Sequence, residues 1–322
     1  MTAATLGTVG WDVRHAARLN RFELVGLAAL LVFLTAASFG VAGMLDATGY
    51  GTWCNPSGEA NPVACESMGR AFYDLQGSLV PLVQGLMLAV PFIGGLLLGV
   101  PLIARELERG TSRLAWSLAP SRARWFLARL LPLLVVMIVV GLVAGVALDR
   151  LYTSIDPWSD LGASFDQFGS RGVVLAARVV FVFAIGVALG AVAGRTLPAL
   201  LVAIVLSWVA VVGGSWVHGK WLASEAVLVD DATGGSLRGA LYFDQRLRDP
   251  SGAILTWDEA YQLMPPDDES GIWPPEGWTF VSLVVPGERY PTVAAREVVA
   301  LGLATLVFLG IAGVAVGRRR PG

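Results

Sequence analysis

Charged side chains that could contact a partner protein gather in one short stretch, Ile103–Arg129. Its 27 residues hold six arginines and two glutamates. The arginines are Arg105, Arg109, Arg113, Arg122, Arg124 and Arg129, and the glutamates are Glu106 and Glu108. A long apolar run lies on each side, so the stretch is a loop between two membrane segments that is large enough to be bound by a soluble protein. A basic loop of this kind is typical of the cytoplasmic side.

The residue patterns of catalysis and nucleotide binding are missing from the sequence. It has no GxxxxGK[ST] phosphate loop, no HExxH, no CxxC and no Ser–His–Asp arrangement. Its two histidines, His15 and His218, leave little general-base chemistry. We therefore expect no catalytic residue, no metal site and no cofactor bound by this chain. If the protein moves a compound uphill, the energy must come from a gradient or from a separate subunit.

The composition is that of a membrane protein. Hydrophobic residues make up 55% of the 322 residues and charged residues only 15%, whereas soluble domains carry about 25% charged residues. Mean hydropathy is +0.65. A single lysine, Lys220, stands against 22 arginines, which argues against a nucleic-acid binder with mixed basic patches.

Six apolar stretches have the roughly 20 residues that a membrane helix needs. They lie near Leu24–Leu45, Leu79–Ile103, Leu130–Leu148, Val173–Ala193, Leu197–Val217 and Val298–Val316. The predicted fold class is an all-α integral membrane protein with six transmembrane helices and a small extracytoplasmic cap before the last helix. The predicted parts are residues 1–22, residues 23–217 with a central cytoplasmic loop at 104–129, a loop domain at 218–297, and residues 298–322.

The distribution of charge predicts that both termini are cytoplasmic. With the N-terminus inside, the inside segments hold 13 basic and 4 acidic residues, and the outside loops hold 9 basic and 21 acidic residues. Short cytoplasmic loops are rich in Arg and Lys. Residues 1–22 lack the apolar core of a signal peptide. Within them, Val9–Phe22 is either an interfacial helix or a basic tail that only fixes topology.

The two loops predicted outside carry the cysteines and most of the acids. Cys54 and Cys65 lie in the first loop, where an oxidising environment favours a disulfide over two thiols. The second loop, 218–297, is rich in aromatic residues and is expected to fold into a cap. Its apolar run Trp278–Val285 is either a re-entrant piece or a buried strand, and Asp267–Glu269 is a solvated turn rather than a cation site.

Few polar residues lie within the apolar segments. Gln84 and Arg178 are the candidates for lining a pathway. Arg178 is only five residues into its segment, so it either lines the pathway or extends outward to water. Asp149 could pair with Arg178 or with Arg171. The absence of a chain of acids through the bilayer weakens a proton-coupled mechanism. Small residues spaced four apart favour close helix packing.

The central loop resembles the loop after the second membrane helix in ABC-2 type transporter permeases. That family has acidic and basic residues, then Gly-Thr, a short amphipathic helix ending near Pro or Ser-Arg, and the third membrane helix. The matching residues here are Arg105, Glu106, Glu108, Gly110, Thr111, Leu114, Pro120, Ser121 and Arg122. Where the family commonly has Leu-Glu after Gly-Thr, this chain has Ser112–Arg113.

The resemblance implies that the loop is a coupling helix that docks in a groove of a separate ATP-binding subunit. Thr111 is a suitable N-cap, and Leu114 and Leu118 form an apolar face with Trp116. Arg113 and the glutamates would orient the contact. The predicted coupling residues are Arg105, Glu106, Glu108, Gly110, Thr111, Arg113, Leu114, Trp116 and Leu118. A loop that only fixes topology would need neither the Gly-Thr break nor the apolar face.

By this resemblance the chain is the permease subunit of an ABC exporter in the plasma membrane of a bacterium. Two permease copies, identical or homologous, would pair around a path lined by the second and fifth segments, with two ATPase chains that bind ATP and Mg²⁺. Few charges face the path, which favours an amphipathic or lipid-like cargo. The alternatives are a gradient-driven transporter that uses a titratable pair such as Asp149 and Arg178, and a membrane anchor or sensor with a ligand-binding cap.

Overall fold

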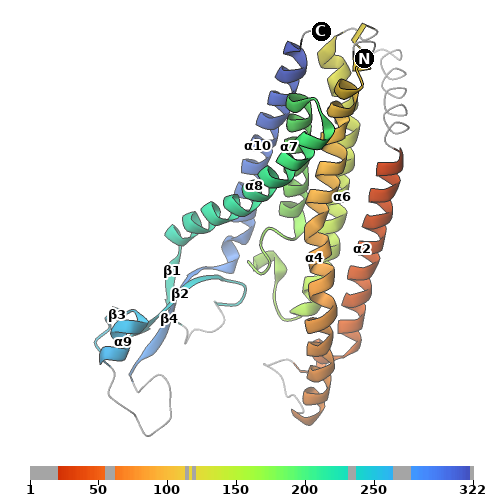
Figure 1. Ribbon diagram of the computed structural model, residues 1–322. Helices are drawn as coiled ribbons and strands as arrows, with labels where there is room; N and C mark the ends of the chain where they lie inside the picture. The colour runs from red at the N-terminus through yellow and green to blue at the C-terminus, as the bar shows by residue number, and fades with distance from the viewer. Residues whose placement is uncertain are drawn as a thin grey trace, which may run out of the picture. The chain divides into compact units, whose positions relative to one another are not determined.

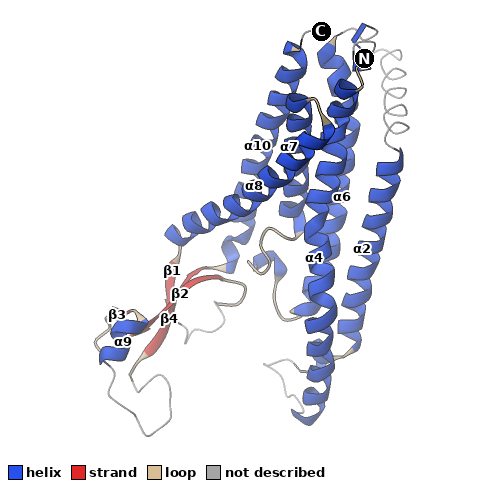
Figure 2. Cartoon of the chain, in the orientation of Figure 1, coloured by secondary structure: helices blue, strands red, loops and turns tan. Residues whose placement is uncertain are grey.

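The six predicted membrane segments all form helices. The computed structural model describes residues 21–54, 62–112, 116–117, 121–230, 237–263 and 277–319. Within these residues six helices are long and apolar enough to cross a membrane. They are α2 (Arg21–Ala47), α4 (Pro62–Glu108), α6 (Arg122–Ile155), α7 (Gly172–Ala193), α8 (Thr196–Ser224) and α10 (Tyr290–Arg318). The predicted all-α membrane class is therefore confirmed, and the helices run beyond the predicted segments because polar turns continue them (Figures 1 and 2).

The chain divides into two compact units. The helical unit contains residues 1–158, 169–212 and 294–322, and the sheet unit contains residues 159–168 and 213–293. The predicted N-terminal interfacial helix lies outside the described residues, except for its last two positions.

Helix α7 is the core of the helical unit. Of its most apolar 18-residue stretch 67% is buried, against 17% for α8 and 11% for α10. Helices α2, α4, α6 and α7 lie side by side in Figure 1. A small apolar core joins α4, α7 and α8, and it is formed by Leu96, Val100, Ala104, Val182, Ala199 and Ala203.

Glycines let α4 and α7 approach each other closely. A Cβ on Gly99 would lie 3.3 Å from the Cα of Gly186, and a Cβ on Gly95 would lie 2.8 Å from the backbone nitrogen of Phe183. A Cβ on Gly190 would overlap the carbonyl oxygen of Val100. The glycines spaced four apart therefore serve packing within one chain, as small-xxx-small spacing does generally.

Replacing Gly190 by alanine is expected to destabilise the helical unit by about 1–3 kcal/mol, because the new methyl group meets backbone that cannot rotate away. The midpoint of thermal unfolding in detergent measures the effect. Gly310→Ala on α10 is the matched control, since its Cβ would have no neighbour within 4 Å. Equal midpoints for the two variants would contradict the close helix contact.

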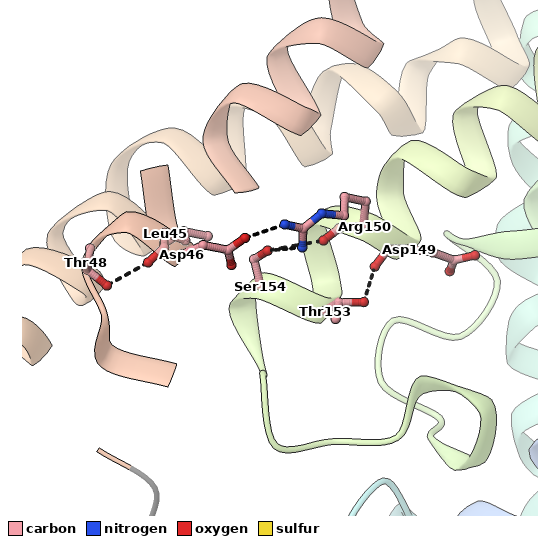
Figure 3. A network of polar contacts seen from close by, with 7 residues as sticks. All are labelled: Leu45, Asp46, Thr48, Asp149, Arg150, Thr153 and Ser154. Carbon is pink, nitrogen blue, oxygen red and sulfur yellow. Dashed lines mark hydrogen bonds and ion pairs between the residues drawn. The ribbon is translucent and has the colours of Figure 1, made fainter. Parts of the chain in front are cut away.

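Helix α2 is tied to α6 near the end of α2. The guanidinium of Arg150 pairs with the carboxylate of Asp46, and it also donates to the Ser154 hydroxyl at 2.7 Å. The Thr48 hydroxyl donates to the carbonyl of Leu45 at 2.6 Å and so satisfies the last turn of α2. Figure 3 shows this polar network.

The predicted disulfide between Cys54 and Cys65 is confirmed. It joins the end of the short helix α3 (Tyr50–Trp53) to the first turn of α4. The ring of Tyr50 stacks on Phe72 with centroids 4.8 Å apart and meets the edge of Trp158. The covalent bond and the aromatic rings hold the connection between α2 and α4 in place.

Reduction of the Cys54–Cys65 bond is expected to lower the free energy of unfolding by about 2–3 kcal/mol, because a short closed loop gains conformational freedom in the unfolded chain. Thermal unfolding with and without a reductant measures the loss. The variant Cys54→Ser should show the low midpoint in both conditions. A reductant effect that persists in this variant would rule out the disulfide as its source.

The sheet unit contains a four-stranded antiparallel sheet in the order β1-β4-β2-β3. The strands are β1 (Val227–Asp230), β2 (Leu241–Arg248), β3 (Ile254–Leu255) and β4 (Thr279–Val285). Of the two interpretations of Trp278–Val285, the buried strand is correct, since β4 is paired on both sides. Val281, Val284 and Val285 of this strand are fully buried.

Short elements complete the sheet unit. Helix α9 (Trp257–Leu263) begins with a capping box, in which the Thr256 amide and hydroxyl donate to Glu259 at 2.9 and 2.8 Å. These bonds from Thr256 hold the pKa of Glu259 below its usual range.

The 3₁₀ turns η1 (Leu161–Ala163) and η3 (Gly287–Arg289) belong to the same unit. Its apolar core is formed by Phe165, Leu222, Val285 and Val293. The acidic run at 267–269 lies outside the described residues.

Candidate functional site

Helix α4 ends at the predicted glycine break. Gly110 has φ +70°, a left-handed conformation that glycine adopts at low cost after a helix. Its amide donates to the carbonyl of Leu107 at 3.3 Å, and the Arg109 amide donates to the carbonyl of Arg105 at 3.0 Å. The Thr111 hydroxyl donates to the carbonyl of Glu106 at 3.4 Å. Both residues of the Gly-Thr pair therefore terminate α4. The predicted coupling residues Arg113, Leu114 and Leu118 lie outside the described residues.

Three charged residues at the end of α4 bind three different helices. Arg105 pairs with Glu23 on α2. Glu106 pairs with Arg129 on α6, where both side chains are largely buried. The last of the three, Glu108, ends α4 and contacts Thr196 at the start of α8.

The Glu108 carboxylate caps the N-terminus of α8. It accepts from the amide of Thr196 at 3.0 Å and from the hydroxyl of the same residue at 2.8 Å. A carboxylate at this position satisfies a free amide and interacts favourably with the helix dipole. Glu106 and Glu108 were expected to orient the contact with a partner protein. The structure gives both glutamates partners within the chain, because helix ends on the same side of the bundle meet here.

Tryptophan and arginine side chains stack at the start of α6. The ring of Trp116 meets the edge of Trp125 with centroids 6.0 Å apart. The guanidinium of Arg122 lies 4.7 Å from the centre of Trp116, and that of Arg129 lies 5.0 Å from the centre of Trp125. Each cation–π contact contributes about 0.5–1 kcal/mol at exposed sites. Trp116, which was expected to contact a partner groove, is also held on α6 of its own chain by these contacts.

The end of α10 joins the same region. Arg122 donates to the carbonyls of Gly317 and Arg319, the first at 3.1 Å. Arg319 in turn donates to the carbonyl of Val192 near the end of α7 at 2.8 Å. Ser121 caps α6 by accepting from the Arg124 amide at 3.2 Å. Residues of the loop therefore contact α2, α6, α8 and α10 directly. They reach a fifth helix, α7, through Arg319.

The two pathway candidates do not come together. Gln84 is half-buried on α4. Arg178 on α7 reaches Glu297 on α10, and its Nε and Nη2 donate to the same carboxylate oxygen at 3.0 and 2.6 Å. The side chains are 15% and 10% exposed. Gly169, with φ +84°, lies against the guanidinium of Arg178, where a Cβ would overlap it.

Of the two partners left open for Asp149, the structure shows Arg171, at 3.5 Å. The Asp149–Arg178 pair named for a gradient-driven transporter is therefore not the pair observed. Glu297 was expected in the outer loop 218–297, but it lies within a membrane-length helix. The reason is that α10 begins at Tyr290, two turns before the apolar run. An acid at the boundary of an apolar segment, opposite an arginine at a similar depth, was the signal for this pair.

The comparison with protein families decides the identity of the helical unit. Residues 24–218 match the family described as ABC-2 membrane transporter related. The chain belongs to this family. Neither a curated protein nor a solved structure matches it.

The ABC-2 match fits the structural division of the chain. It begins in α2, includes the loop after α4, and ends within α8, before the first strand of the sheet. As an ABC-2 permease, the chain is an integral membrane transport subunit rather than a catalytic enzyme, and permeases of this family generally work with an ABC ATPase. The sheet and α10 lie outside the match.

Proposed function

We propose that this chain is the membrane-spanning subunit of an ATP-driven exporter and that a separate ATPase docks on residues 105–122. One observation carries the proposal: three charged residues at the end of α4, within four positions, bind α2, α6 and α8. A force applied to the loop therefore acts on several membrane helices at once. Family membership and the absence of a phosphate loop from the sequence support a separate motor.

The proposed assembly has two permease copies and two ATPase chains, which bind ATP and Mg²⁺, in the plasma membrane of a bacterium. The cargo is amphipathic or lipid-like. This class is supported by the many large aliphatic and aromatic side chains that are exposed on α8 between Leu197 and Val217. They include Leu197, Leu201, Val205, Val209, Trp208 and Trp216.

Docking is tested by co-purification with an ABC ATPase that is encoded next to this chain in the genome, once one is identified. Leu114→Asp should weaken retention of the ATPase at least about tenfold, because it places a charge on the apolar face predicted for the contact. Leu263→Asp, at a position that is 63% exposed at the end of α9, is the control and should bind as the unmodified protein does. Equal retention of the ATPase by both variants would reject docking at the loop.

A gradient-driven transporter is the second candidate, and the Arg178–Glu297 pair is the observation in its favour. A carboxylate between two membrane helices could exchange a proton while its arginine partner is released. Export from vesicles at a fixed ATP concentration separates the candidates. Loss of export on addition of a proton uncoupler favours the gradient, and export that continues favours the ATPase.

A further inference from the structure

An apolar groove runs between α2 and α4 within the helical unit. Its volume is about 470 Å³. On α2 its wall follows Phe22, Gly26 and Leu30, which lie on one face because they are four residues apart. Gly94 and Leu97 belong to the opposite wall on α4. The groove is hollow at Gly26 because this residue has no side chain and a Cβ there would have no neighbour within 4 Å.

One end of the groove is charged. Glu23 lines it and pairs with Arg105, whose side chain remains 41% exposed. The guanidinium of Arg21 lies 4.6 Å from the ring centre of Phe22 at the same end. Two arginines against one glutamate leave a charge of +1 at this rim. A guanidinium has five donors, so Arg105 can bind a phosphate oxygen while it holds Glu23.

We propose that this groove binds one anionic phospholipid, with an acyl chain along Gly26 and Leu30 and the phosphate at Arg21 and Arg105. The groove has a charged end and an apolar length, as a phospholipid does, and the net positive rim complements an anionic headgroup. Only 22% of the most apolar stretch of α2 is buried, so most of this helix is available to the bilayer. The basic end of α2 is also the end where the charge distribution predicts the cytoplasmic leaflet, which is rich in anionic lipids. Lipid binding here does not require an ATPase, although Arg105 also belongs to the proposed docking residues 105–122.

The chain offers matched variants for a test. Gly26→Leu fills the groove without a clash of its Cβ, and Leu97→Trp fills it from the other wall. Gly40→Leu is the control, since Gly40 lies on the same helix, away from the groove, and its Cβ would also have no neighbour within 4 Å. Arg21→Gln removes one positive charge from the rim and leaves the Glu23–Arg105 pair in place.

The purified full chain is titrated with phosphatidylglycerol, or with phosphatidylcholine of the same acyl chains, and bound lipid is counted by native mass spectrometry. One phosphatidylglycerol per chain is expected for the unmodified protein and for Gly40→Leu. Gly26→Leu and Leu97→Trp should lose it while their thermal unfolding midpoints match the control. Arg21→Gln should lower the preference for phosphatidylglycerol about fivefold.

Three results would overturn the proposal. Retention of phosphatidylglycerol by both filled variants would place the lipid elsewhere. Equal binding of phosphatidylcholine would remove the role of the charged rim, and displacement of the lipid by millimolar inorganic phosphate would leave the acyl chain without a role. A change from dimer to monomer in Gly26→Leu, without loss of lipid, would assign the groove to a contact between copies of the chain.

Discussion

Glu297→Ala is expected to be the most destabilising single change in the helical unit, at about 3–5 kcal/mol. It leaves the guanidinium of Arg178 between α7 and α10 without the carboxylate that accepts two of its hydrogen bonds. Gly169 lies against the guanidinium, so the side chain cannot easily leave its site. The midpoint of thermal unfolding in detergent and the yield of monodisperse protein measure the loss.

The design of this experiment separates the buried pair from an ordinary ion pair. Asp46→Ala breaks the pair with Arg150, in which the side chains are 46% and 39% exposed, and should cost less than about 1 kcal/mol. The double variant Arg178→Met/Glu297→Leu removes both charges and should recover most of the stability, since an apolar pair is tolerated where a lone charge is not. If Glu297→Ala and Asp46→Ala had equal midpoints, the Arg178–Glu297 pair would not hold α10 on α7.

The membrane segments could be predicted from the sequence because each is a long apolar run, and this signal does not depend on tertiary structure. The ends of the helices could not, since a polar turn continues a helix wherever its side chains find partners. Tyr290–Glu297 shows the consequence. These residues are too polar to be recognised as part of a membrane segment by their hydropathy, yet they form the first two turns of α10. Because the helix start was predicted too late, Glu297 was assigned to a loop, whereas the structure places it in a buried ion pair with Arg178.

The strand β4 shows a second limit of the sequence. The run Trp278–Val285 is apolar and short, which fits a buried strand and a re-entrant segment equally well. Its pairing with β1 and β2 decides between them, and those strands precede it by more than 30 residues. The disulfide could be predicted because Cys54 and Cys65 are the only cysteines of the chain and both lie in one predicted outer loop.

The central loop was found from residue types, but the partners of its charges were not. The sequence showed glutamates and arginines in a loop where a soluble partner could bind. It did not show that the short turn between α7 and α8 reaches the same place and presents Thr196 to Glu108. The signal was a polar helix start, Thr196, on the side where the predicted loop also lies. Loops on the same side of a bundle are candidates for such contacts even when they are far apart in sequence.

The contact between Glu108 and Thr196 leads to the second large expected effect, which rests on the proposed function. Glu108→Ala should leave docking of the ATPase intact and reduce its coupling to the membrane helices about tenfold. The reason is that the carboxylate holds the N-terminus of α8 through two hydrogen bonds. Loss of this exposed cap should change the stability little, so the protein stays folded.

A fluorophore attached at Val205→Cys, a position that is 63% exposed on α8, gives a readout that needs no known cargo. Both native cysteines are disulfide-bonded, so the label is selective under non-reducing conditions. ATP should change the fluorescence of the complex in the unmodified background and in Glu108→Gln, because the amide oxygen still accepts from Thr196. In Glu108→Ala the change should shrink while the ATPase remains bound. A full response in Glu108→Ala would show that the movement of α8 does not pass through this contact. The connections from Arg105 to Glu23 on α2 and from Glu106 to Arg129 on α6 would then be the next to test.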